Sequence, residues 1–266
     1  MSFWTLERSD YYVETYGTPE DPEDRIKNRM RKASEYLKGD SVLDVGCGVG
    51  HLYPHLKDRI RHYTGFDASP NMLLKARHYY PDADWIEGNI YELQHQVPCF
   101  DTVYSVSLLI HLHDHENAIL QLWTRVKKRL VFLIPLSENE EIITKERGLI
   151  YHYNSFNWIY EFIDTLPHLE KYEIIHWGGL KDRIRSLKKK KGHYFVVLDK
   201  KSSSYEKEKH RLMGMAIRLK PREVNWKTHD FIDCDECYGG LTRFFRCFFC
   251  QRHHICGSCG IFWKND

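Results

Sequence analysis

The sequence predicts an α/β fold in which a mostly parallel sheet of seven strands is covered by helices on both faces. Short apolar runs rich in β-branched residues alternate with segments whose apolar residues recur at helical spacing. The run 42–45 leads into a turn with glycines at alternate positions, which is typical of a strand–turn–helix unit. A polar, lysine- and serine-rich segment begins at residue 199, which places the end of the sheet near residue 200.

Each predicted strand is an apolar run bounded by polar or turn residues. The seven are residues 42–45, 62–67, 83–89, 100–107, 129–135, 172–177 and 193–198. An amphipathic helix is expected around Ile26 and Met30, another after the glycine turn through Leu52 and Leu56, and an aromatic-rich one from Tyr151 to Leu166. Strands that alternate with helices predict a doubly wound sheet with its ligand at the carboxyl ends of the strands.

Composition and charge limit the class of protein. At 266 residues, with 42% hydrophobic and 29% charged residues, the chain can form one full core and a small second module. No apolar run approaches the ~18 residues of a membrane span, and residues 1–7 lack the features of a signal peptide. We therefore expect an intracellular, cytoplasmic protein without membrane contact.

The net charge of +2 conceals a segregation along the chain. Residues 1–177 carry −8, residues 178–227 carry +11 and residues 228–266 carry −1. A basic stretch of this kind can contact the phosphates of nucleic acid or an acidic protein surface. A solvated loop is the alternative interpretation of the same charges.

The glycine turn and two acids predict a nucleotide-like ligand. Gly46 and Gly48 can adopt backbone angles closed to other residues and let a ligand approach the main chain. Asp67 ends the second strand 23 residues after Asp44, where nucleotide-binding units place a carboxylate for the ribose hydroxyls. A nicotinamide-binding turn would have a third glycine at position 51, where this chain has His51, so an oxidoreductase is the lesser interpretation.

Four segments resemble, in order and spacing, the signature motifs of class I S-adenosylmethionine (SAM)-dependent methyltransferases. They are VLDVGCGVG (42–50), YTGFDASPNML (63–73), EGNIYEL (87–93) and FDTVYSVSLLIHL (100–112). The resemblance covers roughly residues 36–198. It implies a Rossmann-like methyltransferase sheet, SAM as the cofactor, and methyl transfer to an O or N nucleophile.

The resemblance also assigns the cofactor-binding residues. Gly46 and Gly48 would lie under the methionine portion, Asp44 would hold its amino group, and Asp67 would bind the ribose. Asn89 stands where the family usually has an aspartate that reaches the adenine amino group, and its amide oxygen can accept the same bond. The remaining candidates are Ala68 and Ile90, which would flank the adenine, and Ser105, which would lie near the methyl sulfonium.

The candidate catalytic residue is a histidine after the fourth strand. Methyl transfer requires alignment and exclusion of water, and a base only when the nucleophile carries a proton. No Asn/Asp-Pro-Pro-Tyr/Phe segment follows this strand, which argues against methylation of amino groups on nucleic-acid bases. His111 is the candidate base or substrate contact, ahead of His113 and His115, and a histidine without a catalytic role is the alternative.

The last forty residues predict a metal site. Six of the eight cysteines form three Cys-x2-Cys pairs, which in a reducing compartment favours zinc over disulfides. The region resembles a ZZ-type zinc finger, which implies one ion on the first and third pairs and leaves the second pair for another ion. A zinc ribbon is the alternative. The predicted ligands are Cys234, Cys237, Cys247, Cys250, Cys256 and Cys259, and His229, His253 and His254 lie nearby.

These features predict three parts: a methyltransferase domain (1–199) with an N-terminal helical cap (1–39), a polar and basic linker (200–228), and a zinc-binding module (229–266). The basic stretch 178–227 and the zinc module slightly favour a macromolecular acceptor, nucleic acid or protein, over a small metabolite. The alternative is a non-catalytic binding protein that uses the methyltransferase fold as a scaffold and the zinc module to bind a partner.

Overall fold

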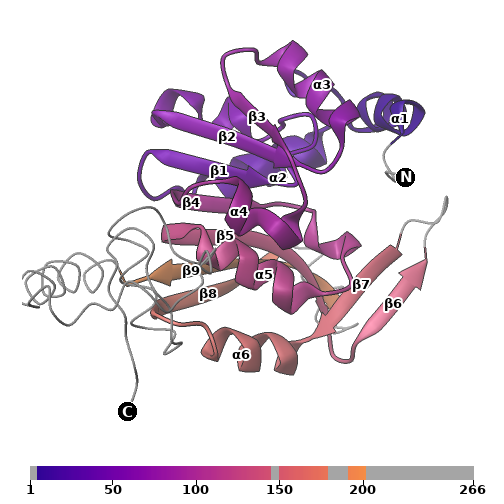
Figure 1. The fold of residues 1–266 in the computed structure, drawn as a ribbon. Coiled ribbons are helices and arrows are strands. Elements are labelled where there is room, and N and C mark those ends of the chain that lie inside the picture. Colours follow the sequence, from indigo (N-terminus) through magenta and orange to yellow (C-terminus); the bar gives the residue numbers. More distant parts are fainter. Residues whose placement is uncertain (1–4, 145–149, 179–190, 202–266) are drawn as a thin grey trace, which may run out of the picture. The chain divides into compact units, whose positions relative to one another are not determined.

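The computed structural model describes residues 5–144, 150–178 and 191–201. Nine strands form one sheet in the order β3-β2-β1-β4-β5-β7-β6, and β9 pairs with both β5 and β8 (Figure 1). The strands are β1 (Ser41–Val45), β2 (His62–Asp67), β3 (Asp84–Glu87), β4 (Phe100–Ser105), β5 (Val126–Ser137), β6 (Glu141–Thr144), β7 (Ile150–Ser155), β8 (Leu169–Trp177) and β9 (Lys191–Lys200).

Six α-helices and four 3₁₀ turns are present in the described ranges. The α-helices are α1 (Leu6–Tyr16), α2 (Asp24–Ser34), α3 (Pro70–Tyr79), α4 (Leu93–Gln96), α5 (His115–Thr124) and α6 (Phe156–Asp164). The 3₁₀ turns are η1 (Tyr53–His55), η2 (Lys57–Arg59), η3 (Ile90–Glu92) and η4 (Leu109–His111). None of these helices is long and apolar enough to cross a bilayer.

Helices cover both faces of the sheet, as predicted. In β5, Leu130 and Phe132 pack in the layer that contains α4, α5 and α6, whereas Val131 and Leu133 pack in the layer that contains α2 and α3 (Figure 1). Alternate residues of a strand point to opposite faces, so a strand that is buried on both sides is apolar throughout. Strands β1 to β5 pair in parallel, β7 is parallel to β5, and β9 is antiparallel to β5 and β8. The α/β sheet is therefore doubly wound and mostly parallel.

The sheet has nine strands instead of the predicted seven. All seven predicted strands are present, and the additional two are β6 and β7. The predicted helix from Tyr151 to Leu166 was wrong in its first part, because residues 150–155 pair with β5 and β6 as a strand. The helix begins only at Phe156, where the Ser155 side chain accepts a hydrogen bond from the backbone N–H of Trp158.

The segment after the glycine turn also differs from the prediction. Leu52 and Leu56 are buried as expected, but they flank the short turn η1 instead of lying in an α-helix. Pro54 lies in the first positions of that turn. Because proline lacks a backbone N–H and fixes its φ angle, it favours a short 3₁₀ turn over a continuous helix at this point.

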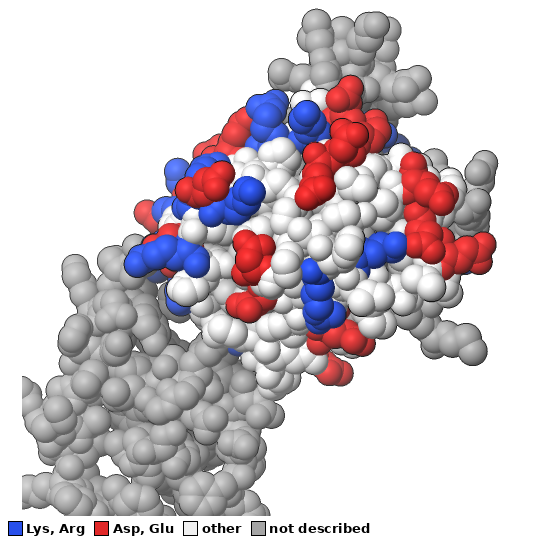
Figure 2. Space-filling model, turned by 90° about the horizontal axis from the view of Figure 1, so that it is seen from above, with Lys and Arg blue, Asp and Glu red and all other residues white. Residues whose placement is uncertain are grey.

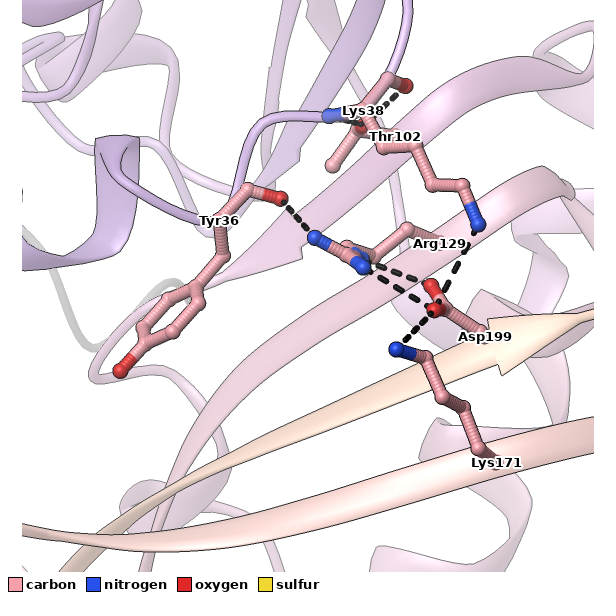
Figure 3. A network of polar contacts seen from close by, with 6 residues as sticks. All are labelled: Tyr36, Lys38, Thr102, Arg129, Lys171 and Asp199. Atoms are coloured by element: carbon pink, nitrogen blue, oxygen red, sulfur yellow. Dashed lines mark hydrogen bonds and ion pairs between the residues drawn. The ribbon is translucent and has the colours of Figure 1, made fainter.

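A buried ion pair joins the amino-terminal part of β5 to the end of β9 (Figure 3). The Arg129 guanidinium donates from Nε and Nη2 to the two oxygens of Asp199 at 2.7 and 3.0 Å, and from Nη1 to the Tyr36 carbonyl at 3.1 Å. Lys38 and Lys171 approach the same carboxylate at 3.4 and 3.6 Å. Burial alone would raise the pKa of Asp199, but Arg129 and Lys38 outweigh it and hold the pKa below its ordinary value.

Charged side chains of both signs are mixed on the face seen from above in Figure 1, as Figure 2 shows for the described residues. Most of the predicted basic stretch 178–227 lies outside the described residues. Of this stretch, the structure describes only residue 178 and residues 191–201. The proposed contact of this stretch with nucleic acid or protein therefore stays a prediction.

Candidate cofactor site

The predicted cofactor residues lie at or just after the carboxyl ends of β1, β2, β3 and β4. The glycine turn after β1 is fastened to β2, because the Gly46 N–H donates to the Phe66 carbonyl at 2.7 Å and the Gly48 N–H donates to Asp67 Oδ2 at 2.9 Å. Gly46 and Gly48 have φ angles of +74° and +55°. These values lie in the left-handed region, so glycine is required for an unstrained turn.

The two glycines differ in what surrounds them. A Cβ atom on Gly46 would approach the Leu108 side chain to 2.6 Å, so this glycine allows close packing inside the protein. A Cβ atom on Gly48 would meet no protein atom within 4 Å. The open space over Gly48 lies beside the Asp67 carboxylate, which fits a cofactor whose ribose and methionine portions lie against this turn.

Asp44 is a buried acid on β1 and is 3% exposed. Its Oδ2 accepts a hydrogen bond of 2.7 Å from the Tyr63 hydroxyl. Burial raises the pKa of Asp44 to about 7, against the opposing effect of the Tyr63 hydrogen bond. An ammonium group placed beside this carboxyl would favour its ionised form, so the residue suits the amino group that the resemblance assigns to it.

Asp67 lies at the end of β2, and backbone amides hold its carboxylate in place. Oδ2 accepts from the Gly48 N–H and Oδ1 from the Ser69 N–H, both at 2.9 Å. Burial raises the pKa of Asp67, although these hydrogen bonds oppose the shift. Each carboxylate oxygen can accept more than one hydrogen bond, so both remain able to accept from ribose hydroxyls.

The adenine and sulfonium residues lie on the neighbouring segments. Asn89 Oδ1 accepts a 3.1 Å hydrogen bond from the Tyr91 N–H and thereby caps η3, which leaves the oxygen one further acceptor position. Ile90 is buried and Ala68 is exposed. Ser105 is fully buried at the end of β4, and its Oγ has no hydrogen-bond partner among the described residues. An orphaned hydroxyl at this edge fits a polar group of the cofactor or acceptor.

The three histidines after β4 have different environments. His111 is half-buried at the end of η4, its ring 5.5 Å from that of Tyr151, and it lines a cavity of about 530 Å³ with the exposed His113. His115 is buried in a structural network: its ring donates to the Leu109 carbonyl at 2.7 Å and contacts the Asn154 amide at 2.6 Å. His115 therefore stabilises the loop, and of the three His111 and His113 are the ones that line the cavity.

Several residues near the site were not predicted. Arg29 on α2 reaches the end of β4 and donates from Nη1 to Ser107 Oγ at 2.7 Å. His51 Nε2 lies 3.0 Å from the Gly17 carbonyl and so fastens the end of α1 to the glycine turn, and Tyr12 on α1 packs against the His51 ring. Burial lowers the pKa of His51 to about 4, which keeps its ring neutral.

The predicted zinc ligands cannot be placed, because residues 202–266 lie outside the described part of the chain. In the part that is described, no group of three or more His, Cys, Asp or Glu side chains could hold a metal ion. The zinc-binding module therefore stays a prediction from the sequence.

A doubly wound sheet with a glycine turn and two acids at its carboxyl edge defines a Rossmann-like nucleotide-binding domain of the methyltransferase type. Residues 42–129 match the family described as methyltransferase domain. This match includes the glycine turn, both acids and the whole of β4. Over residues 42–129 the comparison thus supports the predicted class, a methyltransferase domain.

Individual proteins resemble parts of the chain. Trans-aconitate 2-methyltransferase of Deinococcus radiodurans is 32% identical over 103 residues, which are 38% of this chain and 39% of that protein. Malonyl-[acyl-carrier protein] O-methyltransferase of Pectobacterium atrosepticum is 34% identical over 89 residues, 31% of this chain and 35% of that protein. A solved DhpI-SAM-HEP complex shares the fold, with 15% identity and a TM-score of 0.53 over 73% of this chain and 92% of that one.

Proposed function

We propose that the protein transfers a methyl group from SAM to an O or N nucleophile of a small molecule. The observation that carries the proposal is the open space over Gly48 beside the backbone-held carboxylate of Asp67. SAM is bound in the DhpI complex, which shares this fold. The same residues argue against the alternative of a non-catalytic scaffold, since a scaffold has no need of an intact cofactor turn.

A small acceptor is favoured over the macromolecule that the basic stretch suggested. The two curated relatives are named for methyl transfer to trans-aconitate and to malonyl-[acyl-carrier protein]. The chain spans about two fifths or less of their length, and the family match ends at residue 129. The acceptor therefore has to be inferred from this chain's own residues at the carboxyl edge of the sheet.

The chain's residues would bind and align the reactants. When bound, SAM supplies an electrophilic methyl group on a sulfonium. Asp44 and Asp67 would hold the two ends of its ribosyl-methionine portion, and Ser105 would lie beside the reacting centre. An acceptor oxygen that is already ionised needs no general base. A proton-bearing nucleophile would make His111 the candidate base, since it lines an open cavity together with Tyr91 and Asn117.

The six cysteines at 234–259 are proposed to hold zinc, on the spacing of their Cys-x2-Cys pairs alone. Such a module stabilises itself through the metal, because it is too small to form a core of its own. Its proposed role in recruiting a partner is independent of the cofactor site.

Calorimetry with SAM and with S-adenosylhomocysteine tests the cofactor proposal directly. We expect both to bind the full chain, and transfer of labelled methyl groups into a small-molecule extract to yield a labelled product. If neither ligand binds, the proposed function is wrong. If both bind but no pool of small molecules, protein or nucleic acid accepts the label, the scaffold alternative is favoured.

A further inference from the structure

Arg29 brings a positive charge to the edge of the sheet where the methyl acceptor would bind. It extends from α2 to the end of β4, where its Nη1 donates to Ser107 Oγ at 2.7 Å. Ser107 lies two residues after Ser105, and its φ of +75° is unusual for a residue with a side chain. Such a conformation costs about 1–2 kcal/mol, and residues held in it cluster at functional sites.

The Arg29 guanidinium has no acidic partner among the described residues. It forms none of the ion pairs found there, although Arg129 and Lys75 do. The buried Arg29 Nε atom has no hydrogen-bond partner within residues 5–144, 150–178 and 191–201. Burial lowers the pKa of Arg29, and the nearby Arg25 lowers it further. An unpaired, largely desolvated charge is costly unless a ligand supplies its counter-ion.

The groups that act electrostatically on Arg29 include a cation and several tyrosines. Tyr12 and Tyr151 interact with it electrostatically, and burial raises the pKa of each, in Tyr12 to about 12, so both stay neutral. His193 on β9 also faces Arg29, and burial lowers its pKa to about 4. Around neutral pH the surroundings of Arg29 therefore contain hydroxyl groups and a second cation, Arg25, which together favour an anion.

Tyr12 connects Arg29 to the acids on the cofactor side of the site. Tyr12 interacts electrostatically with Asp44 and Asp67 as well as with Arg29, so its hydroxyl is near both the cofactor residues and the guanidinium. Asp44 and Asp67 are already assigned to the amino group and the ribose.

We propose that Arg29, with Tyr12 and Ser107, forms a subsite that binds a carboxylate group of the methyl acceptor. This inference rests on the proposed methyltransferase function and adds the substrate class, a small carboxylic acid. A guanidinium presents a planar fork of donors that matches a carboxylate. Both trans-aconitate and malonyl groups, the acceptors named for the two relatives, carry carboxylates.

The test is binding of small acids to the full chain saturated with S-adenosylhomocysteine, measured by calorimetry without turnover. The probes are trans-aconitate, malonate, inorganic phosphate and the neutral malonamide. We expect the carboxylates to bind and malonamide not to bind. Arg29→Gln should weaken carboxylate binding about tenfold or more, since it removes a charge-assisted bidentate contact. Arg29→Lys, which keeps the charge but not the fork, should give an intermediate loss.

Arg31→Gln is the matched control. It makes the same substitution on the same helix, at an exposed residue that pairs with Glu35. This variant should bind every probe as the wild type does. All variants should bind S-adenosylhomocysteine within about twofold of the wild type, which shows that each is folded and that the cofactor site is intact.

Four results would overturn the inference. They are no carboxylate binding to the loaded wild type at concentrations on the order of 10 mM, equal binding of malonamide, equal loss in Arg31→Gln, and tighter binding of phosphate than of malonate. In each of these cases S-adenosylhomocysteine still binds, so the methyltransferase proposal stands. If S-adenosylhomocysteine itself does not bind, both proposals fail.

Discussion

Replacement of Asp44 by asparagine tests whether this buried carboxyl holds the amino group of the cofactor. In the ligand-free protein, burial raises the pKa of Asp44 to about 7. A cationic amino group binds the ionised form of the carboxyl. Cofactor binding should therefore release a proton from Asp44 below about pH 7, and affinity should rise with pH until that carboxyl is ionised.

The size of the effect follows from the pKa. With a value near 7, the carboxyl is about 10% ionised at pH 6 and about 90% ionised at pH 8. Wild-type affinity should thus be roughly tenfold greater at pH 8 than at pH 6. Asp44→Asn cannot ionise, so this part of the pH dependence should vanish. At pH 8 the variant should bind about tenfold or more weakly, because a charge-assisted hydrogen bond is lost.

The assay is calorimetric titration with S-adenosylhomocysteine from pH 6 to pH 8. This ligand has the same amino group as SAM and lacks the transferable methyl. Its own amino group titrates equally against both proteins, so the ratio of wild-type to variant affinity isolates Asp44. Titrations in buffers of different ionisation enthalpy count the released proton independently.

Tyr63→Phe gives the matched perturbation. The Tyr63 hydroxyl donates to Asp44 and holds its pKa down, so the variant should shift the midpoint of the affinity profile to higher pH. If the affinity of the wild type and that of Asp44→Asn depended on pH in the same way, the assignment of Asp44 to the cofactor's amino group would be refuted. A downward shift in Tyr63→Phe would show that the electrostatic account of Asp44 is wrong.

Three further predictions follow from the structure. Gly48→Ala should fold with a loss of about 1 kcal/mol, since its φ of +55° is strained but the space is open, and should lose cofactor binding more than about tenfold by calorimetry. Asp199→Asn should lower the free energy of unfolding in urea by about 3 kcal/mol, because it leaves Arg129 without its carboxylate; a loss below about 1 kcal/mol would contradict this. Metal analysis of protein purified without chelators should find at least about one equivalent of zinc, and less would contradict the cysteine argument.

The cofactor side of the site could be predicted because its signals are local. Gly46 and Gly48 need positive φ angles within one turn, and Asp67 ends a strand whose polarity changes abruptly. Parallel topology then brings the ends of β1, β2 and β4 to one edge. Each of these inferences depends on residues adjacent in sequence and on one general rule about parallel sheets, so no long-range contact had to be known.

Strand β7 was missed because its sequence fits two structures. Tyr151 and Tyr153 have high strand propensity, yet the aromatic residues continue into α6 at spacings that also suit a helix. Pairing decides between them: residues 154 and 155 join the end of β5, and Ser155 caps the helix that follows. The pairing partner, the end of β5, lies more than ten residues away in the sequence. No local pattern can therefore reveal that residues 150–155 form a strand.

Arg29 could not be found from the sequence for a related reason. On α2 it lies next to the buried Met30 and resembles any charged residue on the border of an amphipathic helix. Its proposed role rests on two observations: the hydrogen bond to Ser107, which is 78 residues away in the sequence, and the lack of an acidic partner among the described residues. An unpaired charge is a property of the whole three-dimensional arrangement. The signals of the proposed cofactor site thus lie in short motifs, whereas the proposed acceptor subsite depends on a contact between distant segments, which only the structure reveals.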